Sequence, residues 1–324
     1  MRVLKAIFLL VLLAAAAVGF YFYLPYGPTQ ETFVDILSGT GTQDMAAQLQ
    51  KAGIIRSQYA FDAMRLAHGG PLKAGEYRFD HKASVIEIYQ RIRKGDVYTR
   101  TLVIPEGFNI FDIAQAVEAA GLGSKAVFLE AEKKNTGLIA QWSPGATSLE
   151  GYLFPDTYRF SRHATPPLML ATMVKRFGQK MTELNLGNAD VARVVTMASL
   201  IEKEVHIDAE RPLVAGVFEN RLVADMPLQT DPAVIYASML RGTWTGVIHQ
   251  SELHSDSSYN TYVHVGLPPG PICNPGVSAL KAALRPAKTD FMYFVADSTG
   301  ATRFSKDMKE HDAQVAAFRA NAGR

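Results

Sequence analysis

The sequence predicts an α+β protein that follows a membrane anchor, and three observations support this fold class. An uncharged apolar run opens the chain, short strand and helix patterns follow it, and longer helical patterns between Pro- and Gly-rich loops fill the second half. Hydrophobic residues make up 48% of the 324 residues and charged residues 20%, which is typical of a folded protein. We therefore expect an α+β region and then a mixed α/β domain.

The apolar run covers residues 6–24 and contains no charge and no proline. A helix of this length reaches roughly 28 Å, which is close to the thickness of a bilayer's hydrocarbon core. Arg2 and Lys5 precede it, so the positive-inside rule predicts a cytoplasmic tail and single-pass anchor over residues 1–26, with the remainder on the periplasmic or extracytoplasmic side of the inner membrane. A cleaved signal peptide is the alternative, because residues 14–17 are all alanine.

Composition and missing motifs exclude several classes of function. The 33 basic and 31 acidic residues are well mixed, so the chain shows no basic surface of the kind that binds nucleic acid. Cys273 is the single cysteine, so no intramolecular disulfide can form. The sequence has no phosphate-binding loop, dinucleotide fingerprint, HExxH motif or GxSxG motif, and its eight histidines are scattered. We expect neither a metal nor a cofactor.

An internal repeat marks the first folded region. Residues 39–54 align without gaps on residues 107–122, and each copy has a strand, a Gly turn, a helix with Asp in its first turn and a terminal Gly. Between the copies, the sequence predicts a helix over 57–68, a strand over 76–79 and a helix that Ser84 and Glu87 begin as a capping box. We expect residues 27–124 to form one α+β region.

Residues 125–324 have a different pattern and are expected to form the second domain. The predicted elements are helices over 124–134, 166–184, 188–206, 212–222 and 306–321, and a buried strand over 291–296. The polar loops between them are candidates for function, because binding and catalytic residues concentrate on loops.

The segment LEGYLFPDTY, residues 149–158, contains a carboxyl group among apolar neighbours. Glu150 stands next to Leu149 and close to Leu153. Burial among such groups raises the pKa of a carboxyl, which keeps a proton on an acid catalyst near neutral pH. The alternative is a Glu at a strand edge that faces water.

A second carboxyl lies on the apolar face of a helix. In residues 191–205 the apolar side chains recur at helical spacing and place Glu202 on the inward face, whereas Glu204 points elsewhere. A buried charge requires a partner or a role. A salt bridge from Glu202 to Arg211 or Arg221 would be the structural explanation.

Two proline-stiffened loops, residues 228–232 and 259–276, carry clustered donors, acceptors and tyrosine rings. Sugars present hydroxyls for hydrogen bonding and an apolar face that lies against aromatic rings, so these loops suit a glycan. Asn and Asp next to proline are also ordinary turn formers, which is the alternative.

Six blocks in order resemble the YceG-like family of endolytic murein transglycosylases. They are LEGYLFPDTY, ASLIEKEV, ERPLVAGVFENRL, LQTDPAVIYA, YNTYVHVGLPPGPICNPG and ALRPAKTDFMYFVAD. The chain departs from the family pattern at Ser258, where a proline is usual, and at Thr302, where a histidine is often found. Residues 27–124 resemble, more loosely, the small glycan-binding LysM modules.

The resemblance implies Glu150 as the catalytic acid. The supporting or substrate-binding residues that it and the polar loops suggest are Tyr152, Asp156, Glu202, Gln229, Asp231, Asn260, Tyr262 and Asn274. The implied reaction cleaves the β-1,4 bond from MurNAc to GlcNAc in nascent peptidoglycan strands, leaves 1,6-anhydroMurNAc ends and limits strand elongation, with peptidoglycan synthases as partners. The alternatives are a non-catalytic murein-binding scaffold and a murein hydrolase with Glu202 as second carboxylate.

Overall fold

The computed structural model describes residues 2–185, 189–297 and 301–322, and the chain packs as two compact units, Met1–Arg100 and Thr101–Arg324. Both units combine helices with small two-stranded sheets, which confirms the predicted α+β class. The divisions at residues 27 and 125 rest on sequence patterns and stay predictions. The packing itself groups residues 101–124 with the C-terminal unit.

The first unit begins with the apolar helix. α1 (Arg2–Val18) continues into a π-helical turn, η1 (Gly19–Tyr23), and the combined 22 residues have a mean hydropathy of 2.6 with none of the span buried. Length and composition fit a membrane anchor or a signal sequence.

The folded part of this unit is a two-stranded sheet with three helices. β1 (Thr32–Ile36) pairs antiparallel with β2 (Gly75–Phe79), so that Val34 lies opposite Tyr77. The helices are α2 (Thr42–Lys51), α3 (Gln58–His68) and α4 (Val85–Lys94). The predicted capping box at the start of α4 is confirmed, and its helix ends at Gly95 in the left-handed conformation. Phe61, Tyr77 and Tyr89 are fully buried between these elements.

The two copies of the repeat separate into different units. In the second copy, β3 (Arg100–Val103) pairs with β4 (Thr157–Phe160), and α5 (Ile110–Ala119) follows. Each copy therefore packs within its own unit, and the single region over residues 27–124 stays a prediction. The repeated local pattern predicts the strand and helix, but the partner strand, β4, begins at the end of the LEGYLFPDTY segment and continues to Phe160.

The remainder of the second unit is mostly helical. After α5 come α6 (Lys125–Lys134), the 3-10 turn η2 (Thr136–Ile139), α7 (Pro166–Leu184), α8 (Val191–Glu204), α9 (Arg211–Val223), α10 (Asp231–Arg241), α11 (Gln250–Leu253), α12 (Val277–Leu284), β5 (Tyr293–Ala296), β6 (Thr302–Ser305) and α13 (Met308–Ala322). The predicted helix over 166–184 is confirmed residue for residue. Residue 188, in the predicted start of α8, lies outside the described residues.

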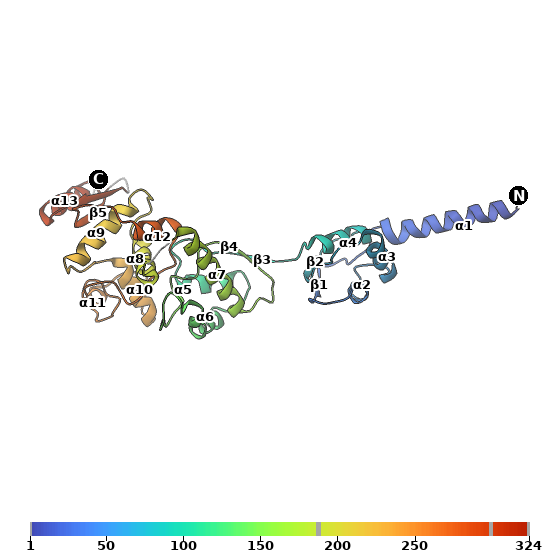
Figure 1. Ribbon diagram of the computed structural model, residues 1–324, viewed down its shortest axis with the longest axis horizontal. Helices are drawn as coiled ribbons and strands as arrows, with labels where there is room; N and C mark the ends of the chain where they lie inside the picture. Colours follow the sequence, from blue (N-terminus) through green and yellow to red (C-terminus); the bar gives the residue numbers. More distant parts are fainter. Residues whose placement is uncertain (1, 186–188, 298–300, 323–324) are drawn as a thin grey trace. The chain divides into compact units, whose positions relative to one another are not determined.

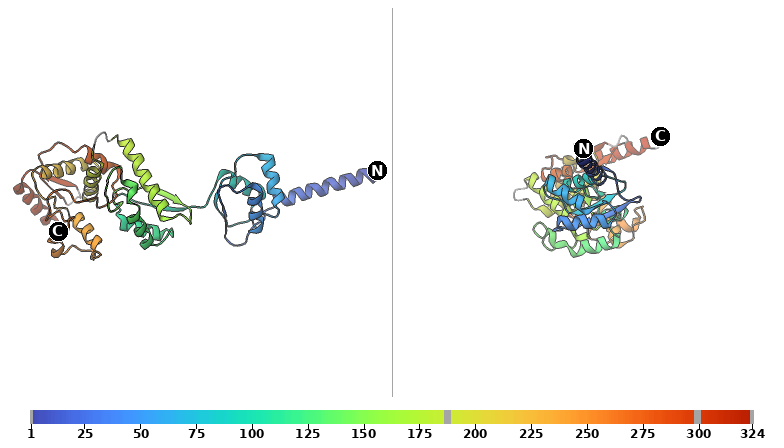
Figure 2. Two further views of the ribbon diagram at one scale, coloured as in Figure 1. Left: turned by 60° about the horizontal axis from the view of Figure 1, so that its bottom comes forward. Right: turned by 90° about the vertical axis from the view of Figure 1, so that its right-hand side faces the viewer.

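One apolar core joins these helices. α8 packs along α12 at its centre (Figure 1), and α7, the long yellow-green helix of Figure 2, packs against α6. The strand expected to be buried, β5, is only partly buried and pairs antiparallel with β6. The expectation of a buried strand was wrong because, in the part of the chain that the structure describes, β5 lies in a two-stranded sheet, so it is covered mainly by α9 and α13.

The close approach of α9 to the segment after α12 generates a stability prediction. A Cβ atom on Gly216 would lie 2.8 Å from Thr289 Cγ2 and closer still to the Ala287 carbonyl oxygen. Because a backbone carbonyl cannot rotate away, Gly216→Ala should lower the free energy of unfolding by about 1–3 kcal/mol, measured by urea denaturation. Gly137→Ala is the control, since a Cβ there meets nothing within 4 Å. Equal stability of the two variants would contradict this packing.

Candidate active site

Glu150 lies in the loop that leads into β4 and is 2% exposed. The loop is tied to α6 through the fully buried Glu132. Ser148 Oγ donates to Glu132 Oε1 at 2.7 Å, the Leu149 N–H donates to the same oxygen, and the Glu150 N–H donates to Ser148 Oγ at 3.0 Å. These bonds fix the backbone on the N-terminal side of Glu150.

Gly151 fixes the other side. Its φ is +86°, and a Cβ atom there would lie 2.5 Å from Pro271 Cγ and 2.7 Å from Val195 Cγ1. Glycine is therefore required by both the left-handed backbone and the close packing. The predicted environment of Glu150, a carboxyl enclosed by the core rather than one facing water, is what the structure contains.

Hydrogen bonds to the Glu150 carboxyl come from the neighbouring Gly151 N–H and from three groups that are distant in the sequence. The backbone N–H of Ile110, in the first turn of α5, donates to Oε2 at 2.9 Å, and Asn274 Nδ2 donates to Oε1 at 2.9 Å. The Tyr236 hydroxyl from α10 is the third hydrogen-bonding group. The site therefore gathers segments that are far apart in the sequence.

Burial dominates the electrostatics at this carboxyl. Desolvation raises the pKa of Glu150 to about 8, and the nearby Glu132 adds to the rise, whereas the hydrogen bonds from Ile110 and Tyr236 oppose it. The N-terminus of a helix also favours a negative charge. Because desolvation outweighs these donors, the carboxyl holds its proton at neutral pH.

Asn274 is the side chain that links Glu150 to the polar loop. Its Nδ2 also donates to the Phe108 carbonyl at 2.9 Å, and its Oδ1 accepts from the Leu153 N–H at 2.7 Å. With both ends of the amide used, Asn274 cannot rotate without losing bonds. It is 0% exposed and holds the orientation of the Glu150 carboxyl.

Glu202 is buried on the inward face of α8, as predicted, and it is paired. Arg211 donates to both of its oxygens, at 2.9 and 3.2 Å, which makes Arg211 rather than Arg221 the partner. Its Oε2 also accepts from the Gly276 N–H at 3.0 Å. Glu202 therefore fixes the backbone two residues after Asn274 and contributes to the site through that loop.

Three residues predicted from the polar loops lie together in a separate pocket, which does not include Glu150 or Glu202. Gln229, Asp231 and Tyr262 line a pocket of about 280 Å³ with Glu204, and Tyr262 donates its hydroxyl proton to Asp231 Oδ1 at 2.6 Å. Asn260 is 0% exposed, and its Nδ2 donates to three carbonyls of residues 252–255, at distances of 2.8 to 3.2 Å. The side-chain amide of Asn260 therefore holds its own loop.

The two other predicted residues lie in the packing around the site. Tyr152 is 2% exposed and packs edge-on against Phe177, with ring centroids 5.0 Å apart. Asp156 forms an ion pair with Arg176 at 2.7 Å. Both support the loop that carries Glu150.

Sequence reasoning missed several groups at the site. They are the Ile110 N–H, Tyr236, Glu132, Ser148 and Glu106, whose carboxyl lies so close to Gly276 that no Cβ would fit there. A backbone N–H leaves no signal in the side-chain pattern. Tyr236 lies within the LQTDPAVIYA block, and membership of that block was the available signal.

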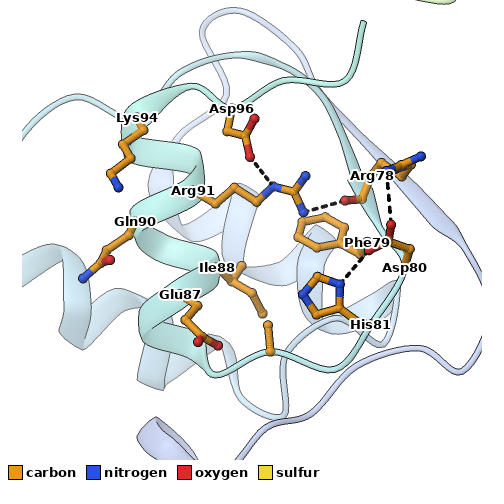
Figure 3. Close-up of a pocket in the computed structure, with 11 residues that line it drawn as sticks. Arg78, Phe79, Asp80, His81, Glu87, Ile88, Gln90, Arg91, Lys94 and Asp96 are labelled. Atoms are coloured by element: carbon orange, nitrogen blue, oxygen red, sulfur yellow. Dashed lines mark hydrogen bonds and ion pairs between the residues drawn. The ribbon is translucent and has the colours of Figure 1, made fainter.

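The first unit has a pocket of its own, of about 550 Å³, beside α4 (Figure 3). Its charged groups bond mainly to one another. Arg91 Nε donates to Asp96 at 3.0 Å, Arg91 NH1 donates to the Arg78 carbonyl at 2.7 Å, and His81 contacts Asp80 at 2.7 Å. The guanidinium of Arg91 also lies over the Phe79 ring, 5.5 Å from its centroid. The pocket is thus a polar surface whose charges are largely balanced internally.

Comparison with known proteins places this arrangement in a family. The model of the YceG-like family matches residues 34–317. The endolytic murein transglycosylase of Bacillus subtilis strain 168 is 34% identical over 299 residues, covering 86% of this chain and 82% of that protein. The endolytic murein transglycosylase of Streptococcus pneumoniae serotype 2 strain D39 is 32% identical over 95% of this chain, which spans 64% of that relative.

A solved structure agrees with these relatives. The crystal structure of a YceG-like protein from Listeria monocytogenes superposes with a TM-score of 0.58 at 32% identity, and covers 88% of this chain and 99% of that chain. The family resemblance of the sequence blocks is thereby confirmed. With a family model that spans both folded units and relatives that match over most of its length, the chain belongs to the YceG-like family.

Proposed function

We propose that the chain is an endolytic murein transglycosylase whose catalytic acid is Glu150. The observation that carries this assignment is a carboxyl that is 2% exposed, has a pKa of about 8 and is oriented by Ile110 and Asn274. The named activities of the Bacillus and Streptococcus relatives support the same reaction class.

In the proposed reaction, the protonated Glu150 donates its proton to the glycosidic oxygen between MurNAc and GlcNAc. The resulting carboxylate then accepts the proton of the MurNAc C6 hydroxyl, whose oxygen attacks C1. The C1–O bond to GlcNAc breaks, a 1,6-anhydro ring forms and the enzyme regains its proton. General acid and base assistance of this kind contributes about 10²- to 10⁴-fold in rate. Because Glu150 is 2% exposed, glycan binding must displace side chains that cover it.

The pairing of Glu202 favours this route over a hydrolase that uses two carboxylates. A second carboxylate would have to act as nucleophile or activate water. Both oxygens of Glu202 instead accept from Arg211, and one also accepts from the Gly276 N–H. Its lone pairs are committed to holding the Asn274 loop.

The N-terminal span suggests where the reaction occurs. With Arg2–Tyr23 as a retained anchor, the enzyme would act from the inner membrane on its periplasmic or extracytoplasmic side, where glycan strands are made. We propose that it limits the elongation of nascent strands, works next to peptidoglycan synthases and holds glycan with a LysM-like first unit. Longer strands in muropeptide profiles after gene deletion would support this role, and unchanged lengths would contradict it.

Substitution of the proposed acid tests the reaction directly. Glu150→Gln should lower the rate of murein cleavage by at least about 10²-fold, because an amide cannot donate a catalytic proton. Mass spectrometry of products from purified sacculi measures both the loss and the chemistry, since hydrolysis adds one water and transglycosylation adds none. Glu183→Gln, at an exposed position, is the matched control and should retain full activity. A Glu150→Gln variant that still releases anhydro ends would overturn the assignment.

The raised pKa of Glu150 predicts a pH dependence of stability. Between the ordinary value of 4.5 and about 8, the folded protein keeps a proton that the unfolded chain has lost, so this residue lowers stability as pH rises. The free energy of unfolding of Glu150→Gln relative to wild type should therefore increase by about 1 kcal/mol per pH unit from pH 5 to 8.

Urea titrations of both proteins across this range measure the slope. The prediction concerns how the difference in free energy of unfolding changes with pH, not its absolute size. The absolute size also includes the pH-independent cost of placing the NH₂ group of Gln among N–H donors. A difference that is independent of pH would show that Glu150 is not protonated in the folded state.

The ion pair of Glu202 predicts a different response. Glu202→Gln removes the buried charge partner of Arg211 and leaves it only the exposed Asp208, 3.4 Å from Nε, so the free energy of unfolding should fall by about 3 kcal/mol. Adding Arg211→Met should recover much of that loss in thermal unfolding. A single variant that keeps its stability but releases no product would instead favour Glu202 as a catalytic carboxylate.

A further inference from the structure

The pocket lined by Gln229, Asp231 and Tyr262 has no role in the reaction just described. Its walls come from α8, α9, α10, β5 and α13 of the second unit and from the loops that carry Gln229 and Tyr262. At about 280 Å³ it lies just below the usual range of sites for drug-sized ligands. It therefore suits one small group rather than a long oligosaccharide.

Hydrogen-bond acceptors dominate this pocket. The Glu204 carboxyl has no hydrogen bond or ion pair with any described residue, and His311 Nδ1 is buried without a partner in the same part of the structure. Asp231 accepts the Tyr262 hydroxyl through Oδ1, which uses the one donor that Tyr262 has. The oxygens of Glu204 and the second oxygen of Asp231 are therefore acceptors that a ligand could use.

The one arginine of the lining does not satisfy them. Arg221 Nε donates to the Met292 carbonyl at 2.8 Å, and its NH1 donates to the carbonyls of Leu228 and Pro227 at 2.9 and 3.3 Å. These bonds direct the guanidinium toward the backbone around the pocket. Its charge offsets one carboxylate, and Glu204 together with Asp231 provides two.

Backbone geometry marks the same place. Gln229 has a φ of +55°, which is uncommon for a residue with a side chain, and its N–H is held by the Thr261 carbonyl at 3.0 Å. Residues held in such conformations cluster at ligand-binding sites. The backbone bond to the second polar loop keeps Gln229 at the pocket wall.

The electrostatics agree with an unmet positive charge. Burial raises the pKa of Glu204 to about 7, the nearby Asp231 adds to the rise and Arg221 opposes it. The other titratable groups that line the pocket are Tyr262 and His311. A bound cation would favour the ionised form of Glu204.

We propose that this pocket binds a primary ammonium group on the peptide part of the murein substrate, an inference that rests on the proposed function. An ammonium has three donors, no acceptor and a positive charge, which matches the open oxygens of Glu204 and Asp231. The rings of Tyr262 and Phe294 provide aromatic walls that attract a cation and cover its alkyl chain. A neutral sugar hydroxyl would leave the excess negative charge of the two carboxylates unbalanced, and a phosphate would be repelled by them.

Titration with a minimal probe tests this site on the full-length protein in detergent. The probe is Nα-acetyl-lysine methylamide, and its Nε-acetylated form is identical except for the lost charge. We expect the first to bind, measured by calorimetry at pH 7, and the second to bind at least 10-fold more weakly. Repeating the titration in buffers with different ionisation heats should show proton release from Glu204.

Variants locate the probe. Glu204→Gln and Asp231→Asn should each weaken binding by at least 10-fold, while the exposed Glu183→Gln, which removes one charge elsewhere, should not change it. Circular dichroism of each variant checks the fold. The inference would be overturned if the probe did not bind or if the acetylated probe bound equally well. It would also be overturned if an N-acetylglucosamine disaccharide bound more tightly than the probe and displaced it from this pocket.

The outcome is separable from that of the proposed function. The probe should bind equally well to Glu150→Gln, because that variant leaves the pocket intact. If the wild type cleaves murein but the ammonium probe does not bind, the pocket inference fails alone. If the probe binds but no glycan is cleaved, the proposed function fails and the binding site remains.

Discussion

The site depends on two opposing effects on the pKa of the Glu150 carboxyl: desolvation raises it and hydrogen bonds lower it. Glu150 receives the Ile110 N–H and the Asn274 amide, which both stabilise a negative charge, yet its burial raises the pKa to about 8. The backbone on either side cannot relax to relieve this burial, because Glu132 ties the preceding residues and Gly151 is packed against Pro271. In this buried position the protonated form of Glu150 therefore has a lower free energy at neutral pH than the ionised form.

A second buried carboxyl of the same unit, Glu202, is stabilised by an ion pair instead of a proton. Glu202 is also buried, at 7% exposure, but it has a bidentate arginine and a backbone donor. Its charge is balanced, and that balance holds Gly276 and so the Asn274 loop. One carboxyl thus provides an acidic proton, and the other positions the amide that orients it.

Signals within short segments predicted many of the helices and strands. They did not predict the contacts between segments that are far apart in the sequence. The capping box at Ser84 and the helix of residues 166–184 follow from spacing and end signals within the segments themselves. α10 was missed because its first two residues, Asp231 and Pro232, are typical of turns, although Pro is also common in the first turn of a helix. Apolar neighbours correctly predicted a buried Glu150. Asn274 was predicted as a supporting residue, but its contact with Glu150, from 124 residues away, and that of the Ile110 N–H, from 40 residues away, could not be predicted.

Two carboxyls of this unit have pKa values near neutrality for related reasons, and their surroundings separate their roles. Around Glu150 the donors are already in place, so its oxygens are filled and what it can exchange is a proton. Around Glu204 no donor of the described residues reaches the oxygens, and Asp231 adds negative charge. A group with filled acceptors suits chemistry, whereas one with empty acceptors suits binding of a donor. The hydrogen-bond inventory therefore distinguishes the two sites where the pKa values alone would not.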